Sequence, residues 1–269
     1  MKIVIPIAGR GSRFHAEEDK NPEYKKPKPL INIKGKPMVM WALESLPFVN
    51  LPHRPAATDD IKVSMKDIIF ICLEEHQKQY KIVDLLKSVL SADINVVLIP
   101  DVTRGALETA LSAKHYLDHD DVIVTDCDHF FNGDGLYKMI KKKDADTEGV
   151  IPVFRPPDSE VKWSYTLFSF KTKRASAVAE KDAVLASKGA YANIGAYYFS
   201  HGDVFVREAQ EVIDSNAMYG PTGKQEFYVA PLYQRLIDKG MKVQAAIVPE
   251  MWGLGTPKDV AAFLKSHKG

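Results

Sequence analysis

The sequence has few of the features that mark a secreted, membrane-bound or nucleic-acid-binding protein. Its 269 residues include only two cysteines, Cys72 and Cys127, both in predicted buried strands, so we expect reduced thiols and a cytoplasmic protein. No apolar run is long enough to cross a membrane, and the first one is too short for a secretory signal. The formal net charge of +1 argues against a nucleic acid or a membrane surface as partner.

Several common functional motifs are missing as well. The chain contains neither a P-loop nor a GxGxxG dinucleotide motif, and no internal repeat that would indicate a β-helix. The histidines lack metal-ligand spacing, so they are interpreted as structural or surface residues, and no arrangement suggests a nucleophilic triad. With 45% hydrophobic residues, the chain can bury a full core, which we expect to be one domain spanning residues 1–269.

The first half of the chain alternates between predicted strands and helices. Strands are predicted at 3–7, 68–73, 96–99 and 121–125, and helices at 37–46, 82–90 and 105–117. This alternation is typical of an α/β protein with a mostly parallel sheet and helices on both faces. Residues 47–66, which are polar and contain several prolines, are predicted to be a loop or an insertion.

The second half has a different pattern. Strands are predicted at 150–154, 165–170, 176–179 and 194–199, with no helix between them. This pattern predicts a smaller, partly antiparallel sheet packed onto the first one. Helices at 203–213 and 227–238, a strand at 243–248 and a helix starting at Pro257 complete the chain.

A glycine-rich basic loop follows the first predicted strand, with the sequence Gly9-Arg10-Gly11-Ser12-Arg13-Phe14. Glycine lets a backbone approach a ligand closely, and the planar guanidinium of Arg13 can bind phosphate oxygens. Lys28 follows between Pro27 and Pro29, which fix the local backbone and keep it out of a helix. Such a loop after a strand is a reasonable binding site for a polyphosphate.

The Gly-x-Gly-Ser-Arg loop, Lys28 in Pro-Lys-Pro-Leu, and Gly-Lys-Pro-Met at 35–38 occur close together. The combination resembles the sugar-1-phosphate nucleotidylyltransferases, which implies a Rossmann-like fold of the GT-A type. By this resemblance, the nucleoside triphosphate is bound by Ala8, Gly9, Gly11, Ser12, Arg13 and Lys28. The resemblance also implies two catalytic roles: Arg13 would stabilise the leaving pyrophosphate, and Lys28 would bridge the α-phosphate and the attacking phosphate.

Asp126 and Asp128 stand at the end of a predicted strand, where open α/β sheets place their ligands. Residues two apart in an extended chain face the same side, and carboxylates are ligands that Mg2+ prefers. In the family that the chain resembles, a metal-binding aspartate is followed by Phe-x-Gly. Asp128, which precedes His-Phe-Phe-Asn-Gly, matches this catalytic metal ligand best, and Asp126 is the second candidate.

The resemblance divides the chain into a nucleotide-binding half, 1–145, and a sugar-phosphate-binding half, 146–269. Arg104 and Gly105 match a second glycine turn, whose backbone reads the base, and we favour a pyrimidine. The candidate sugar-phosphate-binding residues are Glu180, Lys181, Asn193, Gly195 and Lys224.

The C-terminal sequence Trp-Gly-Leu-Gly-Thr at 252–256 is similar to the family's Trp-x-Asp-x-Gly-Thr, but it is one residue shorter and lacks the aspartate. Gly253 stands where the family has an aspartate or asparagine that contacts the metal. Two other functions stay open. Asp126-Cys127-Asp128 is formally the DxD motif of a glycosyltransferase, although such an enzyme has no leaving pyrophosphate to bind. A non-catalytic nucleotide-binding module is the other alternative.

Overall fold

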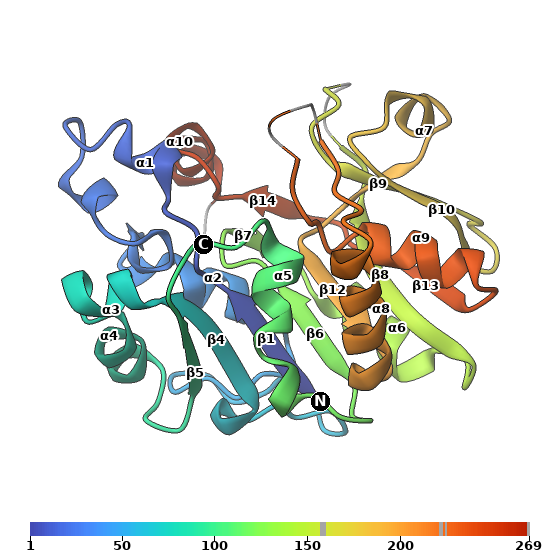
Figure 1. Cartoon of the computed structure of the whole chain (residues 1–269), viewed down its shortest axis with the longest axis horizontal. Helices are drawn as coiled ribbons and strands as arrows, with labels where there is room; N and C mark the ends of the chain where they lie inside the picture. Colours follow the sequence, from blue (N-terminus) through green and yellow to red (C-terminus); the bar gives the residue numbers. More distant parts are fainter. Residues whose placement is uncertain (157–159, 221–222, 224, 268–269) are drawn as a thin grey trace.

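The computed structural model describes residues 1–156, 160–220, 223 and 225–267, and is shown in Figure 1. The strands are β1 (Lys2–Pro6), β2 (Asn32–Ile33), β3 (Lys36–Pro37), β4 (Ile68–Leu73), β5 (Asn95–Ile99), β6 (Val122–Thr125), β7 (His129–Phe131), β8 (Thr147–Phe154), β9 (Ser164–Phe168), β10 (Ala175–Glu180), β11 (Tyr191–Asn193), β12 (Ala196–Phe199), β13 (Lys242–Ile247) and β14 (Met251–Gly253). The α-helices are α1 (Ser12–His15), α2 (Met38–Glu44), α3 (Glu74–Tyr80), α4 (Ile82–Val89), α5 (Ala106–Leu111), α6 (Asp134–Lys142), α7 (Ala183–Ser187), α8 (Gly202–Asp214), α9 (Pro231–Asp238) and α10 (Pro257–Ser266).

A ten-stranded sheet forms the centre of the molecule, with the order β10-β9-β11-β8-β12-β6-β1-β4-β5 and with β13 paired to β8. Strand β1 runs parallel to both β4 and β6, and β4 runs parallel to β5. The predicted mixed α/β class is therefore confirmed. Two short antiparallel pairs, β14–β7 and β2–β3, lie outside this sheet.

The antiparallel strands of the second half extend this same sheet. The sequence predicted a smaller, partly antiparallel sheet packed onto the first one. Instead, β12 is hydrogen-bonded to β6 on one side and to β8 on the other, both antiparallel. The two parts therefore join edge to edge, because β12 pairs with the edge of β6 that lies opposite β1.

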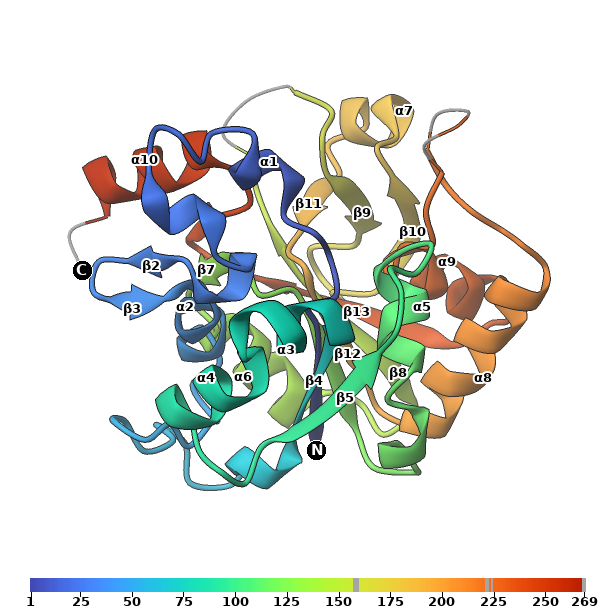
Figure 2. The same ribbon diagram turned by 60° about the vertical axis from the view of Figure 1, so that its left-hand side comes forward.

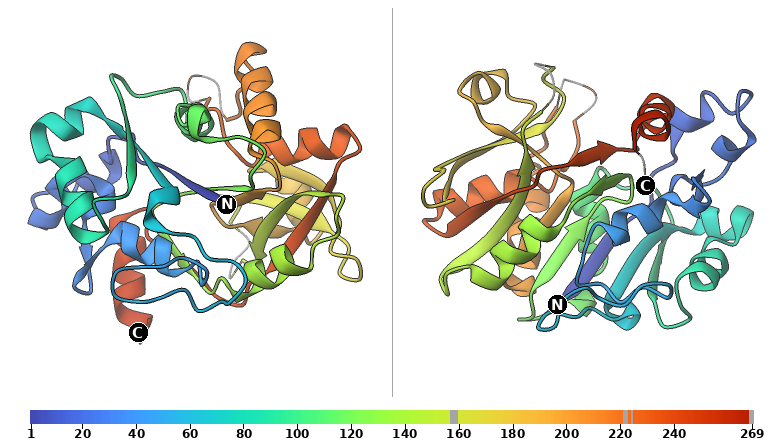
Figure 3. Two further views of the ribbon diagram at one scale, coloured as in Figure 1. Left: turned by 90° about the horizontal axis from the view of Figure 1, so that it is seen from below. Right: turned by 180° about the vertical axis from the view of Figure 1, so that it is seen from behind.

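Helices cover both faces of the sheet (Figures 2 and 3). Alternate residues of β1 belong to different cores: Ile3 and Ile5 pack with residues of α2, α4 and α6, whereas Val4 packs with residues of α5, α8 and α9. All three side chains are fully buried. This two-residue period of a strand, buried on both faces, explains the continuous apolar run that opens the chain.

A third apolar cluster connects the beginning of the chain to its end. Phe14 of α1, Trp41 of α2 and Phe263 of α10 are all buried within it, as is Leu254. The rings of Trp41 and Phe263 meet edge to face, with their centroids 4.9 Å apart. Figure 1 accordingly shows α1 and α10 side by side, although they are far apart in the sequence.

Several local predictions differ from the structure. The helix predicted from 227 begins only at Pro231, because Phe227 is hydrogen-bonded to the backbone of Arg104 and of Leu107. The predicted 194–199 strand begins only at Ala196, because residues 194–195 connect β11 to β12. Lys28 starts a one-turn 3-10 helix, Lys28–Leu30, whereas the sequence predicted no helix there; the fixed φ of proline suits such a turn.

The 47–66 segment is a loop, as predicted, and is anchored to the core. Phe48, Val49 and Val63 are buried, and Val49 pairs with Val63 in a β-bridge. Both cysteines are free and buried, but Cys127 follows β6 instead of lying within a strand. No helix in the described part of the chain is long and apolar enough to span a membrane.

Candidate active site

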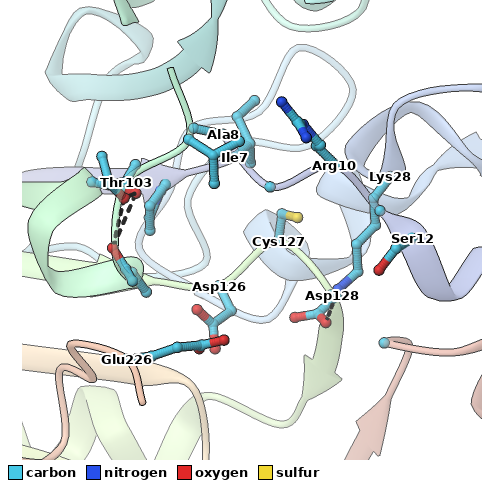
Figure 4. Close-up of a pocket in the computed structure, with 18 of the residues that line it drawn as sticks. Ile7, Ala8, Arg10, Ser12, Lys28, Thr103, Asp126, Cys127, Asp128 and Glu226 are labelled. Carbon is cyan, nitrogen blue, oxygen red and sulfur yellow. Dashed lines mark hydrogen bonds and ion pairs between the residues drawn. The ribbon is translucent and has the colours of Figure 1, made fainter. Parts of the chain in front are cut away.

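A cavity of about 730 Å3 lies at the carboxyl end of the parallel strands β1 and β6 (Figure 4). This is the edge at which open α/β sheets bind ligands. The lining includes Ala8, Gly9, Arg10, Gly11, Ser12, Arg13, Lys28, Thr103, Arg104, Gly105, Asp126, Cys127, Asp128, Gln225, Glu226, Tyr228 and Gly255. The structure thus brings together the residues predicted for the triphosphate, the base and the metal.

The glycine loop leaves β1 and forms one wall of the cavity. Gly11 adopts a left-handed conformation with φ of +67°, and its carbonyl accepts a hydrogen bond from the Phe14 backbone at 2.9 Å. Phe14 is buried beneath the loop, whereas Arg13 is exposed. A buried anchor therefore holds a short loop whose polar side chains stay available. A Cβ on Gly9 would meet no atom within 4 Å, so the backbone there borders open space.

Lys28 and Asp128 form an ion pair within the cavity, in which Lys28 Nζ donates a hydrogen bond to Asp128 Oδ2 (Figure 4). Burial lowers the pKa of Lys28, but the Asp128 carboxylate opposes this and the net shift is upward. Burial likewise raises the pKa of Asp128, yet the Lys28 ammonium outweighs it and holds this pKa below its ordinary value. Both groups are therefore charged at neutral pH.

Asp126 occupies a different position from Asp128. Its backbone N–H donates to the Gly195 carbonyl at 2.7 Å, and its carboxylate lies so close to Gly195 that a Cβ there would collide with it. Burial, followed by repulsion from Asp128, raises the pKa of Asp126 to about 7. Two neighbouring carboxylates with pKa values shifted in opposite directions are typical of a functional site.

His129 is a member of this site that sequence interpretation missed. One ligand atom from each of Asp126, Asp128 and His129 lies within 4.8 Å of the others. The sequence classed the histidines as structural; the only available signal was the place of His129 directly after Asp128 at a strand end. Burial lowers the pKa of His129 to about 4, so the imidazole is neutral, and its Nε2 lies 3.4 Å from Thr125 Oγ1.

The 103–105 turn is braced by the segment before α9. Gly105 has a φ of +153°, and a Cβ there would lie 2.5 Å from the backbone N and O of Phe227. Phe227 N donates to the Arg104 carbonyl at 2.9 Å, and the Arg104 guanidinium stacks over the Phe227 ring. The same guanidinium is paired with Glu108, with 2.5 Å between Nη2 and Oε1.

The described residues predicted for the acceptor, Glu180, Lys181, Asn193 and Gly195, lie beside the cavity and are not part of its lining. Lys181 connects to the lining because its Nζ donates to the Tyr228 hydroxyl at 3.2 Å and is 3.7 Å from Glu180 Oε1. Burial raises the pKa of Glu180. Asn193 is buried, and its Nδ2 has no hydrogen-bond partner in the described part of the chain. Lys224 lies outside the described residues.

The C-terminal glycines are arranged differently from the sequence expectation. A Cβ on Gly253 would face Asp259 and Trp163, at 3.9 and 4.0 Å, and not the aspartates of the cavity. A Cβ on Gly255 would instead lie 2.8 Å from Asp128 Oδ2. The sequence pattern placed Gly253 beside the metal-binding aspartate, but in the structure Gly255 lies beside Asp128. The reason is that β14 ends at Gly253 and the chain then turns back past Asp128.

Comparison with known proteins gives matches in structure alone. No family model matches the chain, and no curated protein matches it. A nucleoside-diphosphate-sugar pyrophosphorylase from Vibrio cholerae RC9 is 21% identical, with a TM-score of 0.72 over 98% of this chain and 100% of the other. An inositol-1-phosphate CTP transferase from T. maritima is 13% identical, with a TM-score of 0.65 over 99% and 96% of the two chains.

A UTP-bound UGPase from Acinetobacter baumannii is 17% identical, with a TM-score of 0.68 over 98% of this chain and 92% of the other. The chain shares the fold of these proteins. Because each match covers nearly all of both chains, the shared fold includes the second half, with its antiparallel strands, as well as the first.

The donor atoms at the aspartates fit a divalent cation with a preference for oxygen. Two carboxylates point into one region of the cavity, and Mg2+ needs only one or two carboxylates when phosphate oxygens and water complete its shell. The neutral imidazole of His129 would suit a softer metal better. Asp128 and Asp126 are thus the residues whose oxygens could hold a divalent cation.

Proposed function

We propose that the protein is a nucleotidylyltransferase that transfers a nucleoside monophosphate from a nucleoside triphosphate to a sugar 1-phosphate or similar phosphomonoester. The observation that carries this proposal is the cavity in which the glycine loop, Lys28, Asp128 and the 103–105 turn face one another. The printed descriptions of the similar structures, a nucleotide-sugar pyrophosphorylase, a CTP transferase and a UTP-bound UGPase, support the same reaction class.

Residues 1–145 form the nucleotide-binding half in this proposal. Its triphosphate ligands are Ala8, Gly9, Gly11, Ser12, Arg13 and Lys28, and the base lies against Arg104 and Gly105. Since the Arg104 side chain is paired with Glu108, the base is read by the backbone of the turn. We favour a pyrimidine, because two of the similar structures are described with CTP and UTP.

Residues 146–269 form the acceptor half. Lys181 anchors the incoming phosphate, and the buried carboxylate of Glu180 accepts hydrogen bonds from acceptor hydroxyls. Asn193, whose buried Nδ2 lacks a partner among the described groups, is the third proposed member of this set. Gly195 and Lys224 complete the proposed set. The free, buried thiols of Cys72 and Cys127 agree with a cytoplasmic location.

The reaction joins two anions, so positioning and charge neutralisation carry the catalysis. An oxygen of the acceptor phosphate attacks the α-phosphorus, the bond to the β-phosphate breaks, and pyrophosphate leaves with the bonding electron pair. The nucleophile is already ionised, so no general base is required. Lys28 bridges the α-phosphate and the attacking phosphate, while Arg13 stabilises the leaving pyrophosphate. Mg2+, held by Asp128 and Asp126, would supply charge neutralisation at the phosphates.

A pyrophosphate-release assay tests this function directly. Each of the four common ribonucleoside triphosphates and dTTP is incubated with Mg2+ and a panel of sugar 1-phosphates and other phosphomonoesters. We expect release of pyrophosphate that depends on both substrates. A glycosyltransferase would instead release a nucleoside phosphate from a nucleotide-sugar, and a regulatory module would bind triphosphate without turnover; either result would refute the proposal.

A further inference from the structure

Gly255 lies directly against the Asp128 carboxylate, although the two residues are far apart in the sequence. A Cβ on Gly255 would be 2.8 Å from Asp128 Oδ2, 3.8 Å from its Cγ and 3.9 Å from Lys28 Nζ. We infer that Gly255 is a positioning residue for the catalytic centre: the missing side chain leaves the space in which Asp128 meets Lys28. The inference rests on the proposed function, which makes these two groups the centre of the reaction.

The backbone around Gly255 is fixed on both sides. Leu254 is fully buried, and its N–H donates to the Asp128 carbonyl at 2.7 Å. Thr256 caps α10, where its Oγ1 accepts from Asp259 N at 3.2 Å and donates to Asp259 Oδ2 at 2.6 Å. A side chain at 255 therefore cannot be accommodated by a shift of its own segment.

The group that must give way is the Asp128 carboxylate. It is the end of a side chain, 23% exposed, and can rotate away from a new methyl group. The same rotation removes the oxygen that pairs with Lys28 and reorients the ligand offered to a metal. A substitution at 255 therefore acts on the pair formed by Lys28 and Asp128.

Gly253 provides a matched control in the same segment. Its Cβ would find only ordinary contacts, 3.9 Å to Asp259 and 4.0 Å to Trp163. Neither Gly253 nor Gly255 has a positive φ, so an alanine at either place meets no backbone strain. The two substitutions add the same atom two residues apart, and only one reaches Asp128.

The first experiment compares Gly255→Ala with Gly253→Ala in the pyrophosphate-release assay. We expect Gly255→Ala to lower kcat by about 100-fold, the scale of a misplacement near 1 Å, and to raise the Mg2+ concentration for half-maximal rate. Its KM for the acceptor should stay near that of the wild type, because Glu180 and Lys181 are untouched. Gly253→Ala should behave like the wild type, and equal effects of the two changes would overturn the inference.

Crystal structures of the two variants test the inference without any turnover. Asp128 should be displaced from Lys28 only in Gly255→Ala, and an unmoved carboxylate there would refute the role of Gly255. If the wild type releases no pyrophosphate with any triphosphate, the proposed function fails, while these structures still decide the role of Gly255.

A double-mutant cycle covers the case of a poorly folding variant. Any loss of unfolding free energy caused by Gly255→Ala should disappear in an Asp128→Ala background, since the colliding oxygen is then absent. Persistence of the full loss would show that the new methyl group meets something other than Asp128, which would overturn the inference.

Discussion

Lys28 and Asp128, 100 residues apart in the sequence, neutralise each other in the free protein through a direct ion pair. Lys28 begins the 3-10 helix Lys28–Leu30, and Asp128 follows β6 at the carboxyl edge of the sheet. Lys28 is thus hydrogen-bonded to an Asp128 oxygen that a metal ion would need as a ligand. We therefore expect Lys28 and the metal ion to compete for Asp128 until phosphate groups bind and Lys28 pairs with them instead.

Replacing Lys28 by methionine should have two opposite effects. Turnover should fall by about 100-fold or more, the scale for loss of one charged group at a transition state. Mg2+ binding to the nucleotide-free protein should become tighter, because Asp128 no longer has a competing cation. Pyrophosphate release and calorimetry with Mg2+ measure the two effects.

Lys26→Met is the matched control, since Lys26 lies two residues away and pairs with Glu23 on the surface. It should change neither quantity. A folded Lys28→Met protein with wild-type turnover would remove Lys28 from the catalytic site, and unchanged Mg2+ affinity would show that the ion pair does not mask the metal ligand.

The parts of the site that could be predicted from the sequence are those whose position follows directly from the preceding strand. Gly9 to Phe14 follow a buried strand directly, so their place at its carboxyl end is determined by the chain. Asp126 and Asp128 are placed in the same way by β6. The position of Lys28 could not be predicted in this way, because its place beside Asp128 depends on tertiary packing. The motif predicted the role of Lys28 but not its partner.

The remaining features depend on contacts between distant segments. Gly195 and Gly255 each make room for one aspartate, and a glycine carries no side chain whose periodicity could reveal such a contact. The late start of α9 at Pro231 depends on pairing between Phe227 and Arg104, not on helix propensity. Similarly, a strand's own sequence does not say which edge it joins, so the β12–β6 pairing was missed.

Two glycines of the cavity should respond differently to alanine. Gly105→Ala places a Cβ 2.5 Å from the Phe227 backbone at a φ of +153°, so we expect a loss of about 1–3 kcal/mol in unfolding free energy. Gly9→Ala meets nothing within 4 Å, and stability should change by less than about 0.5 kcal/mol. Its methyl group nevertheless occupies space next to the loop backbone, so triphosphate affinity should fall roughly tenfold.

Urea unfolding and triphosphate titration of both variants check this contrast. If Gly9→Ala bound triphosphate as tightly as the wild type, the loop would not approach the phosphates closely. If Gly105→Ala were as stable as the wild type, the 103–105 turn would not depend on its contact with Phe227.

Glu180→Ala should mainly weaken binding of the phosphorylated acceptor. One hydrogen bond to a charged group contributes about 1.5–3 kcal/mol, so KM for the phosphorylated acceptor should rise roughly 10- to 100-fold. Triphosphate affinity should change little, because Glu180 lies beside the cavity, next to Lys181. Initial rates with each substrate varied in turn separate the two effects. An equal loss of triphosphate affinity would assign Glu180 to the nucleotide site and contradict the division into halves.

Asp126 should make the metal-free protein less stable as the pH rises. Burial, and next the Asp128 carboxylate, raise the pKa of Asp126 from its ordinary 3.8 to about 7, so the folded state holds a proton that the unfolded state releases. The unfolding free energy therefore falls as the pH rises from about 4 to about 7, and this contribution levels off above that. The neutral amide of the Asp126→Asn variant resembles the protonated carboxyl group and does not titrate. The stability of Asp126→Asn relative to the wild type should thus increase across this window, as measured by urea unfolding in a metal chelator. Parallel pH profiles for the two proteins would contradict the raised pKa of Asp126.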